Sequence, residues 1–236
     1  MYYGWRGKIG LIFPAPGAAP ELEFNKHRPE GVSIFTTRVL FEAVTPAGLK
    51  AMGDRVVEAA KLLAWAEPDV IVFCCTTGSL IGGYGYDQEL IDRIEEASGA
   101  KALTTSTAEV QGLRALGSQK LVVSTPYSDE VNEAERKFLV DSGFDVLKIK
   151  GLGYLDPKLM PKVTIDMMYR LNREVVCPEA DTLFVSCTGL GILDGVPLYE
   201  SDSGLKTISS NQASIWAALR TLGIQDDLGL GSLFKL

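Results

Sequence analysis

The sequence predicts an α/β fold of two pseudo-symmetric, Rossmann-like halves, each built on a parallel sheet. Short apolar runs alternate with longer amphipathic runs along the chain, which is the pattern of strands joined by helical crossovers. The chain also repeats itself in register. Pro14 precedes Cys75 by 61 positions, and Pro126 precedes Cys187 by the same 61 positions. The alternation predicts the fold class, and the repeat predicts two copies of it in one chain.

The expected strands are short apolar runs rich in Val, Ile, Leu and Phe, which suit a buried sheet. They are Lys8–Phe13, Asp69–Cys74, Lys120–Ser124, Asp145–Ile149 and Thr182–Ser186, with two shorter runs at Leu103–Thr104 and Thr207–Ile208.

The expected helices are longer amphipathic runs with capping residues at their ends. Ser128 stands where a helix N-cap would, and Gly117, Gly143 and Gly223 stand where C-caps would. The predicted helices are Pro46–Ala66, Asp87–Ala97, Thr107–Leu116, Ser128–Asp141, Met160–Val175 and Asn211–Leu222.

The repeat consists of three pairs of similar segments, which occur in the same order in both halves. The run Ile9–Gly17 (IGLIFPAPG) is echoed by Lys120–Ser128 (KLVVSTPYS). The run Val70–Gly78 (VIVFCCTTG) is echoed by Thr182–Leu190 (TLFVSCTGL). A third pair, GLRALG and ALRTLG, closes each half. Their order is the same in both halves, so two similar units are expected.

The repeat divides the chain into a first half, residues 1–117, and a second half, residues 118–236, and residues 212–236 can pack back onto the first. In open parallel sheets, ligands bind beyond the carboxyl ends of the strands. Both Cys-Thr pairs of the repeat lie at such ends. A pseudo-two-fold axis would therefore make Cys75 and Cys187 face each other across a cleft between the halves, where we expect the active site.

Composition narrows the classes of function. The net charge of −7 argues against a nucleic-acid partner. The single histidine, His27, is expected in a surface loop, and no Cys-x-x-Cys pattern is present, so no metal is expected. The run GSLIGGYG has neither a dinucleotide nor a P-loop fingerprint, which predicts no bound cofactor. Without a membrane span or a signal peptide, the protein is expected to be cytoplasmic, and a homo-oligomer is allowed.

Cys75 and Cys187 are the candidate catalytic residues. A lone strand-end cysteine is most often a small buried core residue, but these two occupy matched positions and each is followed by threonine. A strand-to-helix turn points backbone N–H groups at such a side chain, which would bind a carboxylate and lower the pKa of the thiol. The pair predicts chemistry on a small carboxylic acid from two opposite sides.

Neighbouring residues are candidates for binding the substrate. Hydroxyl and N–H groups beside the cysteines would stabilise an enediolate, although helix capping and packing are the alternatives for these residues. Pro14 is a candidate for the pocket wall. Arg38 would either clamp a second carboxylate or form a structural ion pair. The candidate oxyanion residues are Thr76, Thr77, Tyr127, Ser128 and Thr188.

Three segments carry a resemblance to a known family. They are TTSTAEVQGLRALGSQKLVVSTPYSDEVNEAERKFL, VTPAGLKAM and FVSCTGLGILD. With the two Cys-Thr sites, they make nearly the whole chain similar to the aspartate/glutamate racemase superfamily. Within it, the chain resembles the branch of arylmalonate decarboxylase and maleate isomerase. The resemblance implies two α/β halves and a cofactor-independent reaction.

The resemblance also implies roles for individual residues. Cys187 matches the single proton-donating cysteine of arylmalonate decarboxylase, in which the position of Cys75 is glycine and that of Leu49 is tyrosine. Leu49 is therefore a further candidate for the pocket wall. Maleate isomerase has both cysteines, and its two substrate-holding asparagines fall on Gly17 and Pro157. The chain thus combines the cysteine pair of the isomerases and racemases with the Thr-Thr loop of the decarboxylase.

These inferences favour a cofactor-independent isomerase or racemase of a small carboxylic or dicarboxylic acid. It would act through an enediolate, or through a covalent cysteine adduct as in the cis–trans isomerisation of maleate. Two alternatives stay open: an arylmalonate-type decarboxylase with Cys187 as proton donor, and a non-catalytic carboxylate-binding protein. A second active-site cysteine has an obvious task only in the isomerase or racemase.

Overall fold

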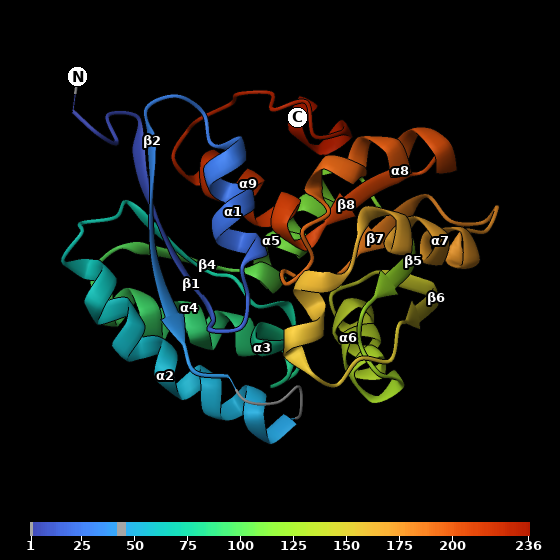
Figure 1. Ribbon diagram of the computed structural model, residues 1–236, viewed down its shortest axis with the longest axis horizontal. Helices are drawn as coiled ribbons and strands as arrows, with labels where there is room; N and C mark the ends of the chain where they lie inside the picture. The colour runs from blue at the N-terminus through green and yellow to red at the C-terminus, as the bar shows by residue number, and fades with distance from the viewer. Residues whose placement is uncertain (1, 42–45) are drawn as a thin grey trace.

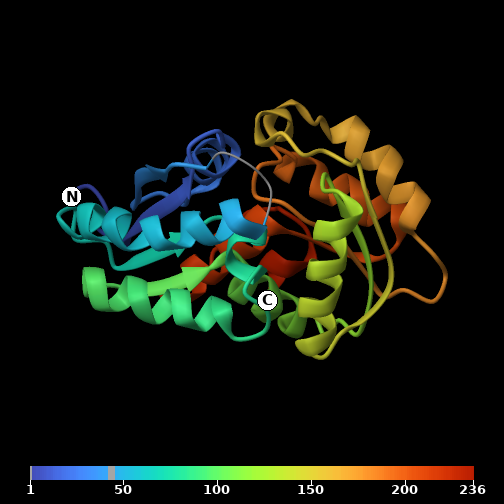
Figure 2. The ribbon, with the colours of Figure 1, turned by 90° about the horizontal axis from the view of Figure 1, so that it is seen from below.

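The computed structural model describes residues 2–41 and 46–236, with the side chains of all of these except 46, 47, 49 and 50. Its strands are β1 (Gly7–Pro14), β2 (Val32–Val39), β3 (Val70–Phe73), β4 (Lys101–Thr104), β5 (Lys120–Thr125), β6 (Asp145–Gly151), β7 (Thr182–Val185) and β8 (Lys206–Ser209). Within the described ranges they form two parallel sheets, in the orders β2-β1-β3-β4 and β6-β5-β7-β8. The second order repeats the first, strand for strand. The predicted pseudo-symmetric α/β fold is confirmed, and Figures 1 and 2 show its two halves.

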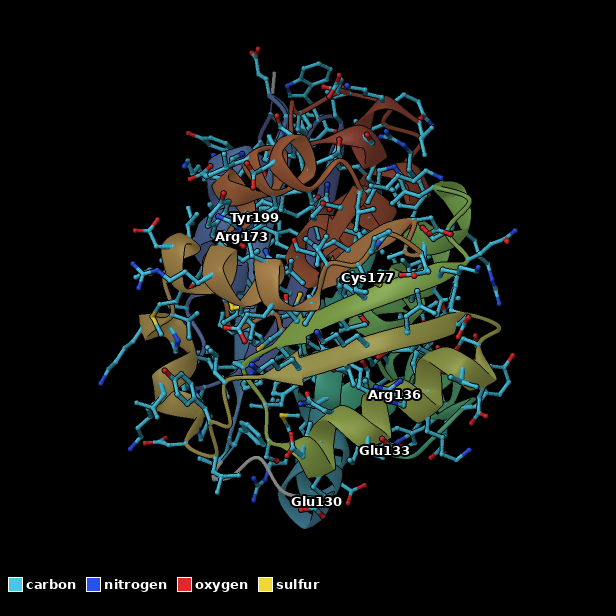
Figure 3. The ribbon with its side chains drawn as sticks, turned by 90° about the vertical axis from the view of Figure 1, so that its right-hand side faces the viewer. Glu130, Glu133, Arg136, Arg173, Cys177 and Tyr199 are labelled. Atoms are coloured by element: carbon cyan, nitrogen blue, oxygen red, sulfur yellow. The ribbon has the colours of Figure 1, made fainter. Side chains whose placement is uncertain are left out.

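Helices cover the faces of both sheets. In the second half, α6 and α7 pack on opposite sides of β5 and β6 (Figure 3). The α-helices are α1 (Ala19–His27), α2 (Pro46–Ala64), α3 (Thr76–Leu80), α4 (Tyr86–Ser98), α5 (Thr105–Ala115), α6 (Asp129–Asp141), α7 (Ile165–Val175), α8 (Val196–Ser203) and α9 (Ser210–Thr221). The short 3₁₀ helices are η1 (Pro157–Lys162), η2 (Leu193–Gly195) and η3 (Ser232–Lys235).

The core follows the predicted strands. β3 and β7 are fully buried, and β1 and β5 are buried apart from their ends, so apolar runs without alternation suit these central positions. All of the predicted strands are present. The expected C-cap glycines also fit, because Gly117, Gly143 and Gly223 have φ values of 65°, 98° and 73°. Ser128 stands at the N-cap position of α6, but its hydroxyl makes no capping hydrogen bond within the described residues.

The sequence reasoning missed α1, β2, α3 and α8. β2 is an edge strand whose side chains are mostly half-buried, and its sequence VSIFTTRV mixes polar and apolar residues without a clear apolar run. The helix predicted at Met160–Val175 is divided into η1 and α7. Pro161 has no N–H to continue a helix, and Thr164 caps the new one, because its Oγ1 accepts the Met167 N–H at 3.2 Å.

α5 and α9 connect the two halves. The two helices pack against each other, and α9 contacts β3 and β4 of the first sheet as well as β8 of the second. In the same way α5 contacts both β4 and β8. In Figure 1 both helices lie between the two sheets. Of the helices in the described ranges, none is long and apolar enough to cross a membrane.

Candidate active site

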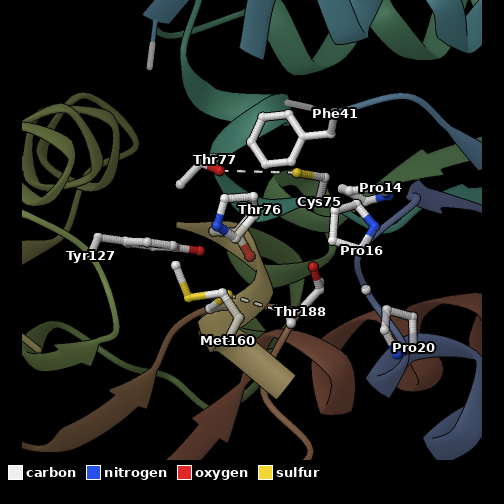
Figure 4. A pocket seen from close by; sticks show the side chains of 14 residues that line it. Pro14, Pro16, Pro20, Phe41, Cys75, Thr76, Thr77, Tyr127, Met160 and Thr188 are labelled. Carbon is white, nitrogen blue, oxygen red and sulfur yellow. Dashed lines mark hydrogen bonds between the residues drawn. The ribbon is translucent and has the colours of Figure 1, made fainter. Parts of the chain in front are cut away.

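A pocket lies where the carboxyl ends of the central strands of both sheets meet (Figure 4). It contains about 470 Å³ of empty space including its open mouth. Its described lining combines apolar walls with a few polar groups. The lining residues are Pro14, Pro16, Gly17, Pro20, Phe41, Cys75, Thr76, Thr77, Tyr127, Pro157, Met160, Cys187, Thr188 and Gly189.

Cys75 lies two residues beyond β3 and caps the N-terminus of α3. The Gly78 N–H donates to its Sγ at 3.4 Å, and Thr77 Oγ1 lies 3.9 Å from the same sulfur. Burial raises the pKa of Cys75 to about 11, although the Gly78 N–H and the Thr77 hydroxyl act in the opposite direction. Cys75 therefore belongs to the pocket as a thiol.

Cys187 holds the matching position two residues beyond β7, but its backbone differs. Its φ of 120° lies in a region that residues other than glycine rarely adopt, at a cost of about 1–3 kcal/mol. The Gly189 N–H donates to its Sγ at 3.2 Å. Burial raises the pKa of Cys187 to about 12, while hydrogen bonds from Tyr127 and Gly189 lower it. The pseudo-symmetry is thus broken at the two cysteines.

The expectation of lowered thiol pKa values is wrong, because burial raises both values. The predicted N–H groups are present, but removing a thiolate from water costs more free energy than these hydrogen bonds return. Both thiols are therefore neutral at pH 7. Each is a proton donor as it stands, and one of them has to lose its proton before it can act as a base or a nucleophile.

The hydroxyl groups of the predicted oxyanion residues divide into two sets. The hydroxyls of Thr77 and Tyr127 face the two sulfurs, and Figure 4 draws the Thr77 contact with Cys75. The hydroxyl of Thr76 instead contacts Ser210 and Glu109 behind the pocket. Thr188 Oγ1 donates to a backbone carbonyl of the other half at 3.2 Å.

Three predicted residues fall outside the described lining. Ser128 is half-buried at the start of α6. Arg38 binds Glu21 Oε2 at 2.7 Å and donates to the carbonyls of Ala15 and Gly17, so it holds the loop after β1 through a structural ion pair. Leu49 belongs to α2, and its side chain lies outside the described residues. Pro14 does line the pocket.

Sequence reasoning missed several wall residues. Pro16 stands in the repeated IGLIFPAPG run, so the repeat could have indicated it. Pro20, Phe41 and Met160 have no local signal, because tertiary packing alone brings them to the strand ends. Phe41 stands over Cys75 in Figure 4.

Two buried carboxyl groups near the pocket were also missed. Glu109 on α5 is 1% exposed, and burial raises its pKa well above the ordinary value. Glu135 on α6 is fully buried, and burial raises its pKa to about 7. In the described part of the chain, neither Glu135 oxygen nor the nearby Ser186 hydroxyl meets hydrogen-bond geometry. The spacing of apolar residues could have indicated Glu135, which lies four residues after Val131 and three before Phe138, on the buried face of α6.

His27 is not in a surface loop as expected. It is the last residue of α1, its side chain is 14% exposed, and its Nε2 lies 3.1 Å from Asp194 Oδ1. Burial lowers its pKa. His27 is not part of the described pocket lining.

Gly151 gives a test of how the Tyr127 loop is positioned. A Cβ at position 151 would lie 2.0 Å from the Tyr127 carbonyl oxygen and 2.8 Å from Asn132 Nδ2. We expect Gly151→Ala to lower the free energy of unfolding by about 1–3 kcal/mol, as overpacking does, and to reduce turnover by displacing Tyr127. Urea unfolding measures the first effect. Gly191→Ala is the control for stability, because its Cβ would meet only Ala19 Cβ, at 4.0 Å. Equal stability of the two variants would contradict the prediction.

Two α/β halves whose strand-end cysteines share one pocket are the arrangement expected of an enzyme of the aspartate/glutamate racemase superfamily. The family model of arylmalonate decarboxylase matches residues 9–234. The chain belongs to the arylmalonate decarboxylase family.

Known relatives of the chain include both decarboxylases and isomerases. Arylmalonate decarboxylase of Bordetella bronchiseptica is 32% identical over 219 residues, covering 91% of this chain and 90% of that protein. A liganded arylmalonate decarboxylase, in which one glycine is replaced by cysteine and one cysteine by serine, has a TM-score of 0.91 at 30% identity, covering 97% of this chain and 98% of that one. A Nocardia farcinica maleate cis–trans isomerase variant with a covalently bound succinylcysteine intermediate has a TM-score of 0.92 at 26% identity, with coverages of 97% and 98%. The named relatives are enzymes, which favours catalysis over binding alone.

Proposed function

We propose that this enzyme inverts the α-carbon of a small carboxylic acid with an apolar substituent. Cys75 and Cys187 exchange protons with opposite faces of that carbon. The observation that supports this most directly is that both thiols, at matched positions in opposite halves, line the same pocket. An α-proton beside a carboxylate is too weakly acidic to leave unaided, so the enzyme has to stabilise the enediolate that forms.

In the proposed reaction, the thiolate of one cysteine takes the α-proton and the thiol of the other gives a proton to the opposite face. The hydroxyls of Thr77 and Tyr127 donate to the developing enediolate from beside the two sulfurs. Before the first turnover one thiol gives its proton to solvent. Cys75 is the better initial thiolate, because burial raises its pKa to about 11, against about 12 for Cys187. After one turnover Cys75 is a thiol and Cys187 a thiolate, so the enzyme is ready for the reverse direction.

The apolar wall supports a monocarboxylic substrate with an apolar substituent. Pro16, Pro20 and Met160 provide this wall. Gly17 and Pro157, which take the places that the family resemblance gives to the two substrate-holding asparagines of maleate isomerase, also line the pocket. Neither side chain can bind a second, distant carboxylate. A substrate such as maleate therefore fits the described lining less well.

Decarboxylation of a disubstituted malonate is the second candidate. Two observations favour it: the raised pKa keeps Cys187 protonated as a donor, and the apolar wall suits the departure of carbon dioxide. In that reaction Cys187 protonates the enediolate alone, and Cys75 has no task.

Incubation in deuterated water separates the candidates. The panel is a single enantiomer of a 2-arylpropionate, maleate, and a methyl-aryl-malonate, followed by chiral chromatography with mass spectrometry. We expect deuterium in both enantiomers of the arylpropionate and little conversion of maleate to fumarate. Fast maleate conversion would contradict the apolar-substrate proposal. Release of carbon dioxide with a single deuterated enantiomer as product, and no exchange of the arylpropionate, would establish the decarboxylase.

A further inference from the structure

The backbone of Cys187 is fastened from outside its own loop. Its N–H donates to Ser210 Oγ at 2.9 Å. Ser210 is fully buried and is the first residue of α9. The preceding Ser209 and Gln212 form a capping box, which fixes the turn that carries Ser210. The strained φ of Cys187 is therefore held by a hydroxyl on a rigid helix start.

Glu109 orients that hydroxyl. Ser210 donates to Glu109 Oε1 at 2.6 Å, which leaves its oxygen lone pairs free to accept the Cys187 N–H. Thr76 Oγ1 lies 3.1 Å from the same carboxyl oxygen and 2.9 Å from Ser210 Oγ. One buried carboxyl on α5 thus reaches the residue after Cys75 and, through Ser210, the backbone of Cys187.

The corresponding positions of the first half are built differently. Thr105 is the first residue of α5, as Ser210 is of α9, but its hydroxyl donates to the Phe73 carbonyl at 3.2 Å. Ser214 stands four residues into α9, as Glu109 does in α5, and reaches back across to Thr105 at 3.3 Å. Cys75 has an ordinary φ of −155°. The two cysteines therefore differ in how their backbones are held: the Cys187 N–H donates to the Ser210 hydroxyl, whereas the Cys75 N–H donates to the Phe73 carbonyl at 3.1 Å.

We infer that Ser210, oriented by Glu109, is a positioning residue that holds the Cys187 sulfur at its angle to the substrate. A relaxed Cys187 backbone would swing the sulfur away from the α-carbon. Such a displacement lowers the rate of proton transfer more than it weakens binding of the substrate. The inference rests on the proposed function and adds Ser210 as the residue that orients Cys187.

The test compares three variants by thiol alkylation and by turnover. Iodoacetamide labelling of each cysteine, followed by peptide mass spectrometry, needs no substrate and so judges Ser210 even if the proposed reaction is wrong. For Ser210→Ala we expect faster labelling of Cys187, with Cys75 unchanged, and a fall in kcat of about 10²-fold with little change in KM. Glu109→Ala should alter the labelling of both cysteines. Glu109→Gln keeps an oxygen acceptor, so the labelling of both cysteines should match that of the wild type.

Two further variants separate positioning from general destabilisation. Ser214→Ala removes a buried hydroxyl that contacts the Ser210 carbonyl and Thr105 but leaves the Ser210 hydroxyl in place, so labelling and kcat should stay near wild type. Ser210→Thr keeps the hydroxyl, and the matching position of the first half is already threonine. Its kcat should therefore be close to that of the wild type rather than to that of Ser210→Ala. Equal changes in the labelling of both cysteines in Ser210→Ala, or a kcat within about twofold of wild type, would overturn the inference.

Discussion

Alanine at position 75 or at position 187 is expected to lower racemisation by about 10³-fold or more, because each variant removes the proton donor or acceptor on one face of the substrate. Binding should survive, since the apolar wall and the hydroxyls of Thr77 and Tyr127 remain. Turnover is measured by chiral chromatography, and binding by protection of the remaining pocket cysteine from alkylation.

The two cysteine variants also distinguish a racemase from a decarboxylase. In a decarboxylase, Cys187→Ala would be inactive while Cys75→Ala kept its activity on the malonate. Cys177→Ala is the matched control, because Cys177 is only partly buried and is not part of the described pocket lining. Full racemase activity of Cys75→Ala would remove that cysteine from the mechanism.

Stability is expected to fall between about pH 4.5 and 7 because of buried carboxyl groups. Burial raises the pKa of Glu135 to about 7, so the folded state keeps a proton that the unfolded state has lost. The stabilisation from Glu135 is complete below the pKa of this carboxyl in the unfolded chain, and it is lost as the pH rises to the pKa in the folded protein. A shift of this size corresponds to at most about 3 kcal/mol. Glu23 behaves in the same way, with its pKa raised to about 7 by burial.

Glu135→Gln isolates this contribution. The amide resembles the protonated carboxyl, so the variant should match the wild type at pH 4 and be more stable at pH 8. Urea unfolding across this range measures the difference. Glu133→Gln is the control, because Glu133 lies on the outer face of α6 beside Arg136 (Figure 3) and its side chain is 73% exposed. Parallel pH profiles for wild type and Glu135→Gln would contradict the prediction. Other titratable groups, such as His27 with its lowered pKa, are the same in the wild type and in both variants, so they do not affect the comparison.

The position of the two cysteines could be predicted from the sequence because it depends on local features. An apolar strand followed by Cys-Thr, repeated at one spacing, identifies both strand ends. The edge strand β2 could not be predicted in the same way, since half-buried strands tolerate mixed residues. The walls formed by Phe41 and Met160 depend on how distant segments pack.

The chemical state of the site was harder to predict than its location. The N–H groups beside the sulfurs follow from the turn that succeeds a strand, and they are present. The depth of burial, which outweighs them in the thiol pKa values, follows only from the complete fold. The inward orientation of Glu109 could have been predicted from its helical spacing to Leu113, but its contacts with Ser210 and Thr76 follow only from the packing of distant segments.

The shared position of α5 and α9 bears on how a substrate reaches the pocket. Each helix contacts strands of both sheets, so the halves cannot swing apart about a hinge without separating these two helices. A hinged opening of the two halves would therefore break the packing of α5 against α9. Without that separation, admission of substrate and release of product are expected to need only local movements of the segments that line the pocket.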